Sequence, residues 1–175
     1  MPSTSGDQPS SGHVPSLPVP PMVADLGPIT HALFRVARLN RLHARKLLKP
    51  SGLHPAQELV MMQLWGVGPQ RQTDLVNLLG SDAATMTRTI RRLEDEGFIT
   101  RRRDERDKRA TIIEATAESQ ALRAGVEQVW SELEATVTRG LDQEQRDVLL
   151  ALLETVESGQ AHILVDAQID GIAQI

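Results

Sequence analysis

The stretch that decides the fold covers residues 72–116 and reads QTDLVNLLGSDAATMTRTIRRLEDEGFITRRRDERDKRATIIEAT. Thr73 and Gly80 delimit a short helix, because Thr is a favourable N-cap and Gly commonly ends a helix. Ser81 and Gly97 delimit a second helix in the same way. Apolar side chains recur along this second helix at helical spacing, which predicts one buried face, made of Met86, Ile90 and Leu93. The stretch therefore begins with a helix-turn-helix.

A basic hairpin is predicted directly after the second helix. Residues 98–103 and 108–114 have the length and composition of two short strands, and the polar tip 104–107 separates them. The hairpin carries six cations, which are Arg101, Arg102, Arg103, Arg106, Lys108 and Arg109. Two helices and a basic hairpin together form a winged helix-turn-helix. The expected fold class is therefore mainly α with a small β hairpin, a winged helix-turn-helix joined to a helical dimerisation region.

Further helices are predicted on both sides of this motif. Pro28 lies in the first turn of a helix that ends near Lys49, and Pro55 is the first residue of the next helix. After the hairpin, apolar residues at helical spacing predict two more helices, and Asp142 is the expected cap of the second. The chain is thus divided into a disordered Pro/Ser-rich tail, one domain and an extension of unassigned structure, at residues 1–21, 22–160 and 161–175.

Charge is distributed unevenly along the chain, although the net charge is only −4. Residues 31–109 hold 16 Lys and Arg against nine Asp and Glu, whereas residues 110–175 hold three against 12. Binding of a polyanion depends on the local field, so the acidic total does not argue against nucleic acid. The charge counts alone also allow an alternative, in which the charged residues only form solvated surfaces whose charges happen to be segregated along the chain.

Composition also excludes several classes of function. The chain has no Cys, which excludes disulfides, Cys nucleophiles and thiol-based redox sensing. Its longest apolar run, residues 148–153, is far shorter than the roughly 20 residues that a membrane helix needs. The His residues lack metal-ligand spacing, and no P-loop, GxGxxG, GxSxG or HExxH motif is present. We therefore expect a cytoplasmic protein that is not an enzyme and needs no metal, cofactor or membrane.

The predicted motif has the chemistry of a double-stranded DNA reader. A helix fits the major groove, and its first turns present short or hydrogen-bonding side chains to base edges. A basic hairpin tip can follow the phosphate backbone or place an Arg in the minor groove, and a helix N-terminus attracts phosphate. The predicted DNA contacts are Thr73, Asp82, Ala83, Ala84, Thr85, Thr87, Arg88, Arg91, Arg92, Arg103, Arg106, Asp107, Lys108 and Arg109.

Residues 29–158 resemble the MarR family of bacterial winged helix-turn-helix transcriptional regulators, most specifically in TDLVNLLG, TMTRTIRRLE and GFITR followed by DKRA. The resemblance implies that Arg109 reaches the minor groove and that Asp107 orients it. It also implies a homodimer, which the surplus of apolar helix surface favours independently, on a palindromic operator. The DNA-binding lobe is then expected at about 53–116, and the dimerisation helices at about 28–49 and 117–158.

Many members of this family respond to small phenolic or aromatic acids, so the resemblance also implies a repressor that a ligand releases from DNA. A cation beside an aromatic wall suits a carboxylate, and the candidate ligand residues are His31, Arg35, Met62, Trp65 and Trp130. Each of these side chains also has a plain structural interpretation, as core or as solvated surface. Two alternatives stay open, a winged-helix module for protein interaction and a DNA binder without a ligand.

Overall fold

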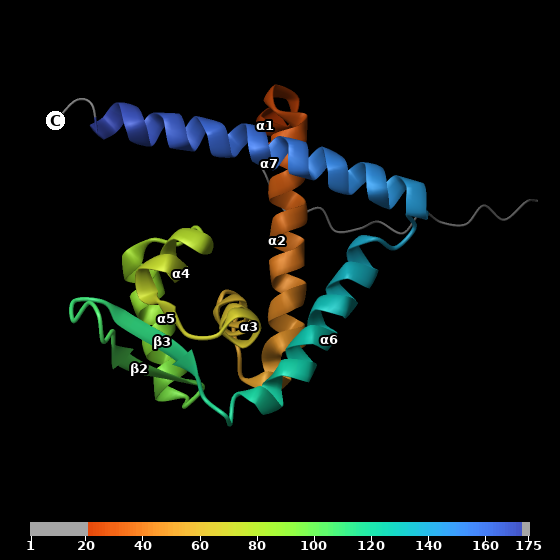
Figure 1. Ribbon diagram of the computed structural model, residues 1–175. Coiled ribbons are helices and arrows are strands. Elements are labelled where there is room, and N and C mark those ends of the chain that lie inside the picture. Colours follow the sequence, from red (N-terminus) through yellow and green to blue (C-terminus); the bar gives the residue numbers. More distant parts are fainter. Residues whose placement is uncertain (1–20, 173–175) are drawn as a thin grey trace, which may run out of the picture. The chain divides into compact units, whose positions relative to one another are not determined.

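The computed structural model describes residues 21–172 of the chain, and the side chains of residues 24–161 within that range. The chain divides into two units, residues 1–42 and 43–175. The first contains the short helix α1 (Pro21–Leu26) and most of helix α2 (Pro28–Leu48) (Figure 1). The predicted disordered tail lies outside the described residues except at Pro21, which is the first residue of α1.

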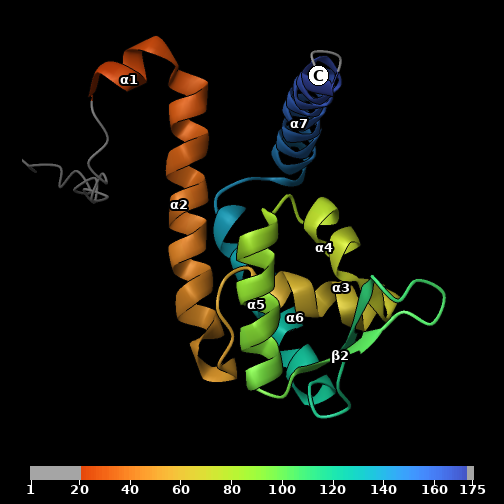
Figure 2. The ribbon, with the colours of Figure 1, turned by 90° about the vertical axis from the view of Figure 1, so that its left-hand side faces the viewer.

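The second unit contains the winged helix, which confirms the predicted fold class. Helices α3 (Gln57–Val67), α4 (Gln72–Leu78) and α5 (Ala83–Asp95) precede the hairpin of β2 (Ile99–Arg103) and β3 (Thr111–Ala115). We call residues 99–115 the wing, and its tip projects away from α5 (Figure 2). The sheet has a third strand that the sequence did not predict, β1 (Gln70–Arg71), and its antiparallel order is β1-β3-β2.

A single apolar cluster holds these helices and strands together. Met86, Ile90 and Leu93 are at most 2% exposed, so the predicted buried face of α5 is confirmed. They share the cluster with Ile99 and Ile113 from the sheet, and with buried side chains of α3. Burial of each large aliphatic side chain contributes about 1.5–3 kcal/mol, which fixes the opposite, polar face of α5 toward solvent.

Three predicted helix starts are wrong by one or two residues. Helix α3 begins at Gln57 because Ala56 takes a left-handed conformation, with φ of 85°, and Pro55 therefore lies outside the helix. The N-cap of α4 is Arg71 rather than Thr73, which lies inside the first turn. The N-cap of α5 is Asp82 rather than Ser81. Each true cap is an extended or left-handed residue directly before the first helical turn.

Two long helices complete the second unit, α6 (Gln120–Val137) and α7 (Gln143–Ile172). The predicted cap Asp142 is confirmed, because its Oδ1 accepts from the Gln145 N–H at 2.9 Å while Gln145 Oε1 accepts from the Asp142 N–H at 3.1 Å. Helix α7 continues to Ile172, so residues 161–172, which had no assigned structure, are helical. No helix in the described part of the chain has both the length and the apolar character needed to cross a membrane.

Candidate nucleic-acid interface

The amino end of α5 is fixed by a side-chain cap. Asp82 Oδ1 accepts a hydrogen bond from the Thr85 backbone N–H at 2.7 Å. Hydrogen bonds from Thr85 hold the pKa of the Asp82 carboxyl below its usual value. Asp82, predicted to contact DNA, therefore already has a structural role, and it keeps a negative charge at the helix N-terminus. Ala83 and Ala84 are exposed beside it, so the backbone here is open to close approach.

The solvent face of α5 carries hydroxyls and cations in the first two turns. Arg88 Nη2 donates to Thr85 Oγ1 at 2.8 Å, which directs the guanidinium toward the amino end of the helix. Thr87 Oγ1 donates to the Ala83 carbonyl at 2.7 Å, and it accepts from Gln72 Nε2 at 3.1 Å. The predicted contacts further along α5 also lie on its exposed surface, namely Arg91 and Arg92.

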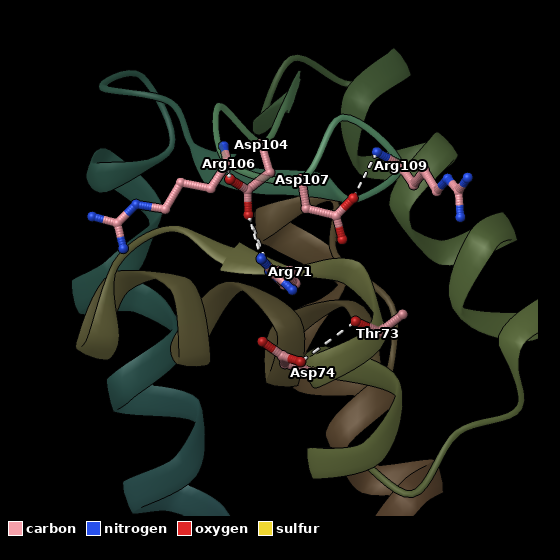
Figure 3. A network of polar contacts seen from close by, with 7 residues as sticks. All are labelled: Arg71, Thr73, Asp74, Asp104, Arg106, Asp107 and Arg109. Carbon is pink, nitrogen blue, oxygen red and sulfur yellow. Dashed lines mark hydrogen bonds and ion pairs between the residues drawn. The ribbon is translucent and has the colours of Figure 1, made fainter.

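The tip of the wing is ordered by two carboxylates (Figure 3). Asp104 Oδ1 accepts from the Arg106 N–H at 2.8 Å, and Asp107 Oδ1 accepts from the Arg109 N–H at 3.0 Å. Arg71 from β1 donates to Asp104 Oδ2 through Nε at 3.1 Å and through Nη2 at 2.7 Å. The Arg106 N–H, and then Arg71, hold the pKa of Asp104 below its usual value. These hydrogen bonds join the two carboxylates to backbone N–H groups of the tip and to Arg71 of β1. The cationic side chains of the tip take no part in them.

Most of the predicted cations are free of ion pairs. Among the residues that the structure describes, the ion pairs of this region join Arg71 to Asp104, Arg101 to Glu94 and Arg102 to Glu114. None of these pairs involves the exposed cations of α5 and the wing, which are Arg88, Arg91, Arg92, Arg103, Arg106, Lys108 and Arg109. Arg106 and Arg109 extend from the tip in different directions (Figure 3). The arrangement offers several unneutralised positive charges to a polyanion.

Two residues of this region were missed by the sequence analysis. Arg71 and Gln72 stand at the junction of β1 and α4, where one contacts the wing and the other contacts α5. Arg71 is the N-cap of α4, but Arg is not a residue type that favours this position, and neither residue belongs to an apolar repeat, so local pattern gives them no signal. Thr73, which was predicted to meet phosphate, is exposed in the first turn of α4, and its Oγ1 lies 3.4 Å from Asp74 Oδ1 (Figure 3).

The five predicted ligand residues are distributed over both units. His31 and Arg35 belong to the first unit, on α2. In the second unit, Met62 is half-buried on α3, Trp130 is 40% exposed on α6, and Trp65 is buried. The Trp65 Nε1–H donates to Ser119 Oγ at 3.1 Å, which satisfies its polar atom inside the protein.

A separate groove of about 530 Å³ runs along α6 in the second unit. Its lining is mainly apolar but contains one cation and one carboxylate, and it includes Lys46, Leu47, Leu122, Val129 and Glu132. This lining does not include the three ligand candidates of the second unit.

Comparison with known proteins identifies the same motif. The MarR family model matches residues 53–111. The HTH-type transcriptional regulator YwoH of Bacillus subtilis (strain 168) is 37% identical over 92 residues, which cover 53% of this chain and 66% of the relative, just under two thirds. A MarR transcriptional regulator from Methanosarcina mazei Go1 superimposes with a TM-score of 0.69 at 26% identity, covering 76% of this chain and 96% of that structure. Reduced AbfR bound to DNA gives 0.67 at 26% identity, covering 82% and 96%.

Proposed function

Because this chain belongs to the MarR family of transcriptional regulators, we propose that it binds double-stranded DNA sequence-specifically, with α5 in the major groove and the wing tip at the minor groove. The observation that carries the proposal is the set of unpaired, exposed cations on α5 and the wing. Two of them, Arg88 and Arg91, lie one helical turn apart and suit the N7 and O6 acceptors of guanine. The solved structure of reduced AbfR, which has a similar fold, is bound to DNA, and this supports DNA binding by the present chain.

The proposal includes a homodimer that presents two α5 helices to successive major grooves of a palindromic operator. Its support is apolar surface that lies exposed in the single chain. Ile29 and Phe34 of α2 are each 71% exposed, and Leu150 and Leu152 of α7 are each 59% exposed. A soluble monomer rarely exposes so many large aliphatic and aromatic side chains, whereas a dimer would bury them. Light scattering should give twice the chain mass, and Leu152→Glu should shift the protein toward monomer.

We further propose that the protein represses transcription in the cytoplasm and that a small aromatic acid releases it from DNA. The candidate ligand residues remain His31, Arg35, Met62, Trp65 and Trp130. A ligand can act in this way only if it binds the DNA-free form more tightly than the DNA-bound form. Benzoate and related acids should then raise the melting temperature of the free protein and weaken its binding to the operator. A DNA binder without a ligand would show neither effect.

The deciding experiment for DNA binding is fluorescence anisotropy with the duplex directly upstream of the protein's own coding sequence. A scrambled duplex of equal composition is the specificity control, and each titration is repeated at several salt concentrations. We expect tight binding to the native duplex, weaker binding to the scrambled one, and a steep salt dependence because the cations displace counterions. Arg88→Ala and Arg91→Ala should each cost about 1–3 kcal/mol on the native duplex.

Arg139→Ala is the matched control, because Arg139 is exposed in the turn that follows α6, outside α5 and the wing, and the change removes the same charge. Arg109→Ala should weaken binding to both duplexes more evenly if Arg109 acts at the backbone and minor groove. Wild-type protein that ignores duplex DNA at low salt would overturn the proposal. Capture of one specific protein partner in that case would favour the interaction module instead.

A further inference from the structure

We infer that Arg71 is a positioning residue, which fixes the wing against the helix-turn-helix by holding the Asp104 carboxylate. The inference rests on the proposed DNA binding, because a wing held at one place can reach DNA only in register with α5. Arg71 and Asp104 are 33 residues apart in the chain, yet two guanidinium nitrogens lie 3.1 and 2.7 Å from Asp104 Oδ2. The pair therefore fastens the start of the wing tip to β1, in addition to the backbone pairing of Gln70 and Arg71 with β3.

The positions of Arg71 and Asp104 in the fold indicate that their contact holds two structural elements together and is not an incidental surface ion pair. Arg71 is the last residue of β1 and the N-cap of α4, so it belongs to the helix-turn-helix. Asp104 directly follows β2, and its N–H donates to the Ala110 carbonyl across the tip at 3.0 Å. The Asp104 side chain is only 15% exposed, and its other oxygen accepts from the Arg106 N–H. One carboxylate thus orders the tip and fastens it to β1.

The next residue in the chain, Gln72, contacts α5, the other element proposed to read DNA. Gln72 Nε2 donates to Thr87 Oγ1 on α5 at 3.1 Å. Thr87 in turn donates to the Ala83 carbonyl in the first turn of α5, so this contact lies at the end of the helix proposed to enter the groove. Arg71 and Gln72 therefore reach the wing and α5 from one short junction, and these polar contacts add to the apolar cluster that the two elements share.

Charge alone predicts the opposite effect to positioning, which makes Asp104 the informative residue. Removal of a carboxylate near a polyanion strengthens binding if that carboxylate only repels phosphate. It also strengthens binding if Asp104 merely withholds Arg71 from a phosphate. Removal weakens binding only if the carboxylate holds the wing in a productive place. Asp104→Asn is the suitable change, because the amide retains an oxygen that can accept from the Arg106 N–H while losing the charge that holds Arg71.

Anisotropy with the upstream duplex should show that Asp104→Asn weakens binding about threefold to tenfold, the range that a half-exposed ion pair and its geometry can supply. Arg71→Gln should weaken binding similarly, and the double variant should lose little more than either single one. Glu105→Gln is the matched control, since it removes the same charge one residue away from an exposed side chain. It should leave binding unchanged or make it tighter. An Asp104→Asn protein that binds as well as wild type overturns the inference.

A second measurement tests the positioning role without DNA. Backbone ¹⁵N relaxation should give lower order parameters for residues 105–109 in Asp104→Asn and Arg71→Gln than in wild type and Glu105→Gln. All four proteins should have similar unfolding midpoints, because a half-exposed ion pair contributes little to global stability. An unchanged, rigid tip in both variants overturns the inference. If wild type itself ignores the duplex, the proposed function fails, and the relaxation data alone decide whether Arg71 positions the wing.

Discussion

Ser119→Ala should destabilise the protein far more than the loss of one small hydroxyl suggests. Ser119 is fully buried at the start of α6, and Trp65 of α3 is 8% exposed. Ser119 Oγ accepts from the Trp65 Nε1–H at 3.1 Å and donates to the Thr116 carbonyl at 2.7 Å. Alanine removes both bonds and leaves the indole N–H buried without an acceptor. An orphaned buried donor costs about 1–3 kcal/mol, so we expect Ser119→Ala to cost about 2 kcal/mol in total.

A double-mutant cycle isolates the contact between the two side chains. Trp65→Phe removes the indole N–H and retains an aromatic ring, so in this background Ser119→Ala no longer orphans a donor. The cost of Ser119→Ala should then fall to about 1 kcal/mol, which gives a coupling energy of about 1 kcal/mol. The unfolding midpoint of the single variant should drop by about 4–8 °C, since ~1 kcal/mol corresponds to roughly 2–4 °C for a chain of this size.

Urea unfolding followed by far-UV circular dichroism measures all four corners of the cycle at one fixed protein concentration, because association changes apparent stability. Ser131→Ala is the matched control, since Ser131 lies on the same helix, is exposed, and donates to the Glu127 carbonyl at 3.2 Å. This control should change stability by less than about 0.5 kcal/mol. The reasoning is refuted if Ser119→Ala costs no more than Ser131→Ala, or if its cost is the same in the Trp65→Phe background.

Three further predictions concern stability. Ile90→Ala deletes a fully buried side chain under the proposed recognition helix and should cost about 3 kcal/mol in urea unfolding, whereas the smaller change Ile90→Val should cost about 1 kcal/mol. Burial raises the pKa of Glu58, so ionisation costs the folded state more than the unfolded one. Glu58→Gln should therefore raise the melting temperature at pH 7, and the gain should vanish below the ordinary carboxyl pKa; an equal gain at all pH values would contradict this. The pKa of Asp82 is lowered by its cap, so its stabilisation is present above the unfolded-state pKa and is lost as pH falls through the folded value. Asp82→Ala should lower the urea midpoint at neutral pH more than Asp82→Ser, which retains a cap acceptor, and the deficit of Asp82→Ala should shrink in acid.

Local signals were sufficient to predict α5 and the hairpin. Met86, Ile90 and Leu93 recur at helical spacing. Gly97 follows the C-cap of α5 and takes the left-handed conformation, with φ of 76°, that commonly ends a helix. Each signal lies within a few residues of the element that it predicts. The cap assignment moved from Ser81 to Asp82 because either side chain can accept an N–H, and only the backbone conformation selects one of them.

Features that depend on distant partners could not be predicted in this way. Strand β1 has two residues, and it exists because Gln70 and Arg71 pair with β3. The contact between Arg71 and Asp104 likewise depends on tertiary structure. The length of α7 has a different origin: the dimerisation helices were expected to end at about residue 158, yet α7 continues through Gly159 to Ile172. A glycine inside a helix costs only about 1 kcal/mol, and no proline follows it to force a stop.

The wing also shows why net charge is a poor guide to a nucleic-acid interface. Its tip holds three acids, and a count of charges suggests partial cancellation of the nearby cations. Two of those acids, Asp104 and Asp107, accept backbone N–H groups, so they are turned toward the protein's own chain. The guanidinium of Arg106 instead extends outward (Figure 3). Because screening limits electrostatic effects to about 10 Å at 0.1 M salt, each phosphate responds to the charges directed at it and little to the acidic remainder of the chain. An overall charge of −4 is therefore compatible with a strongly attractive local surface.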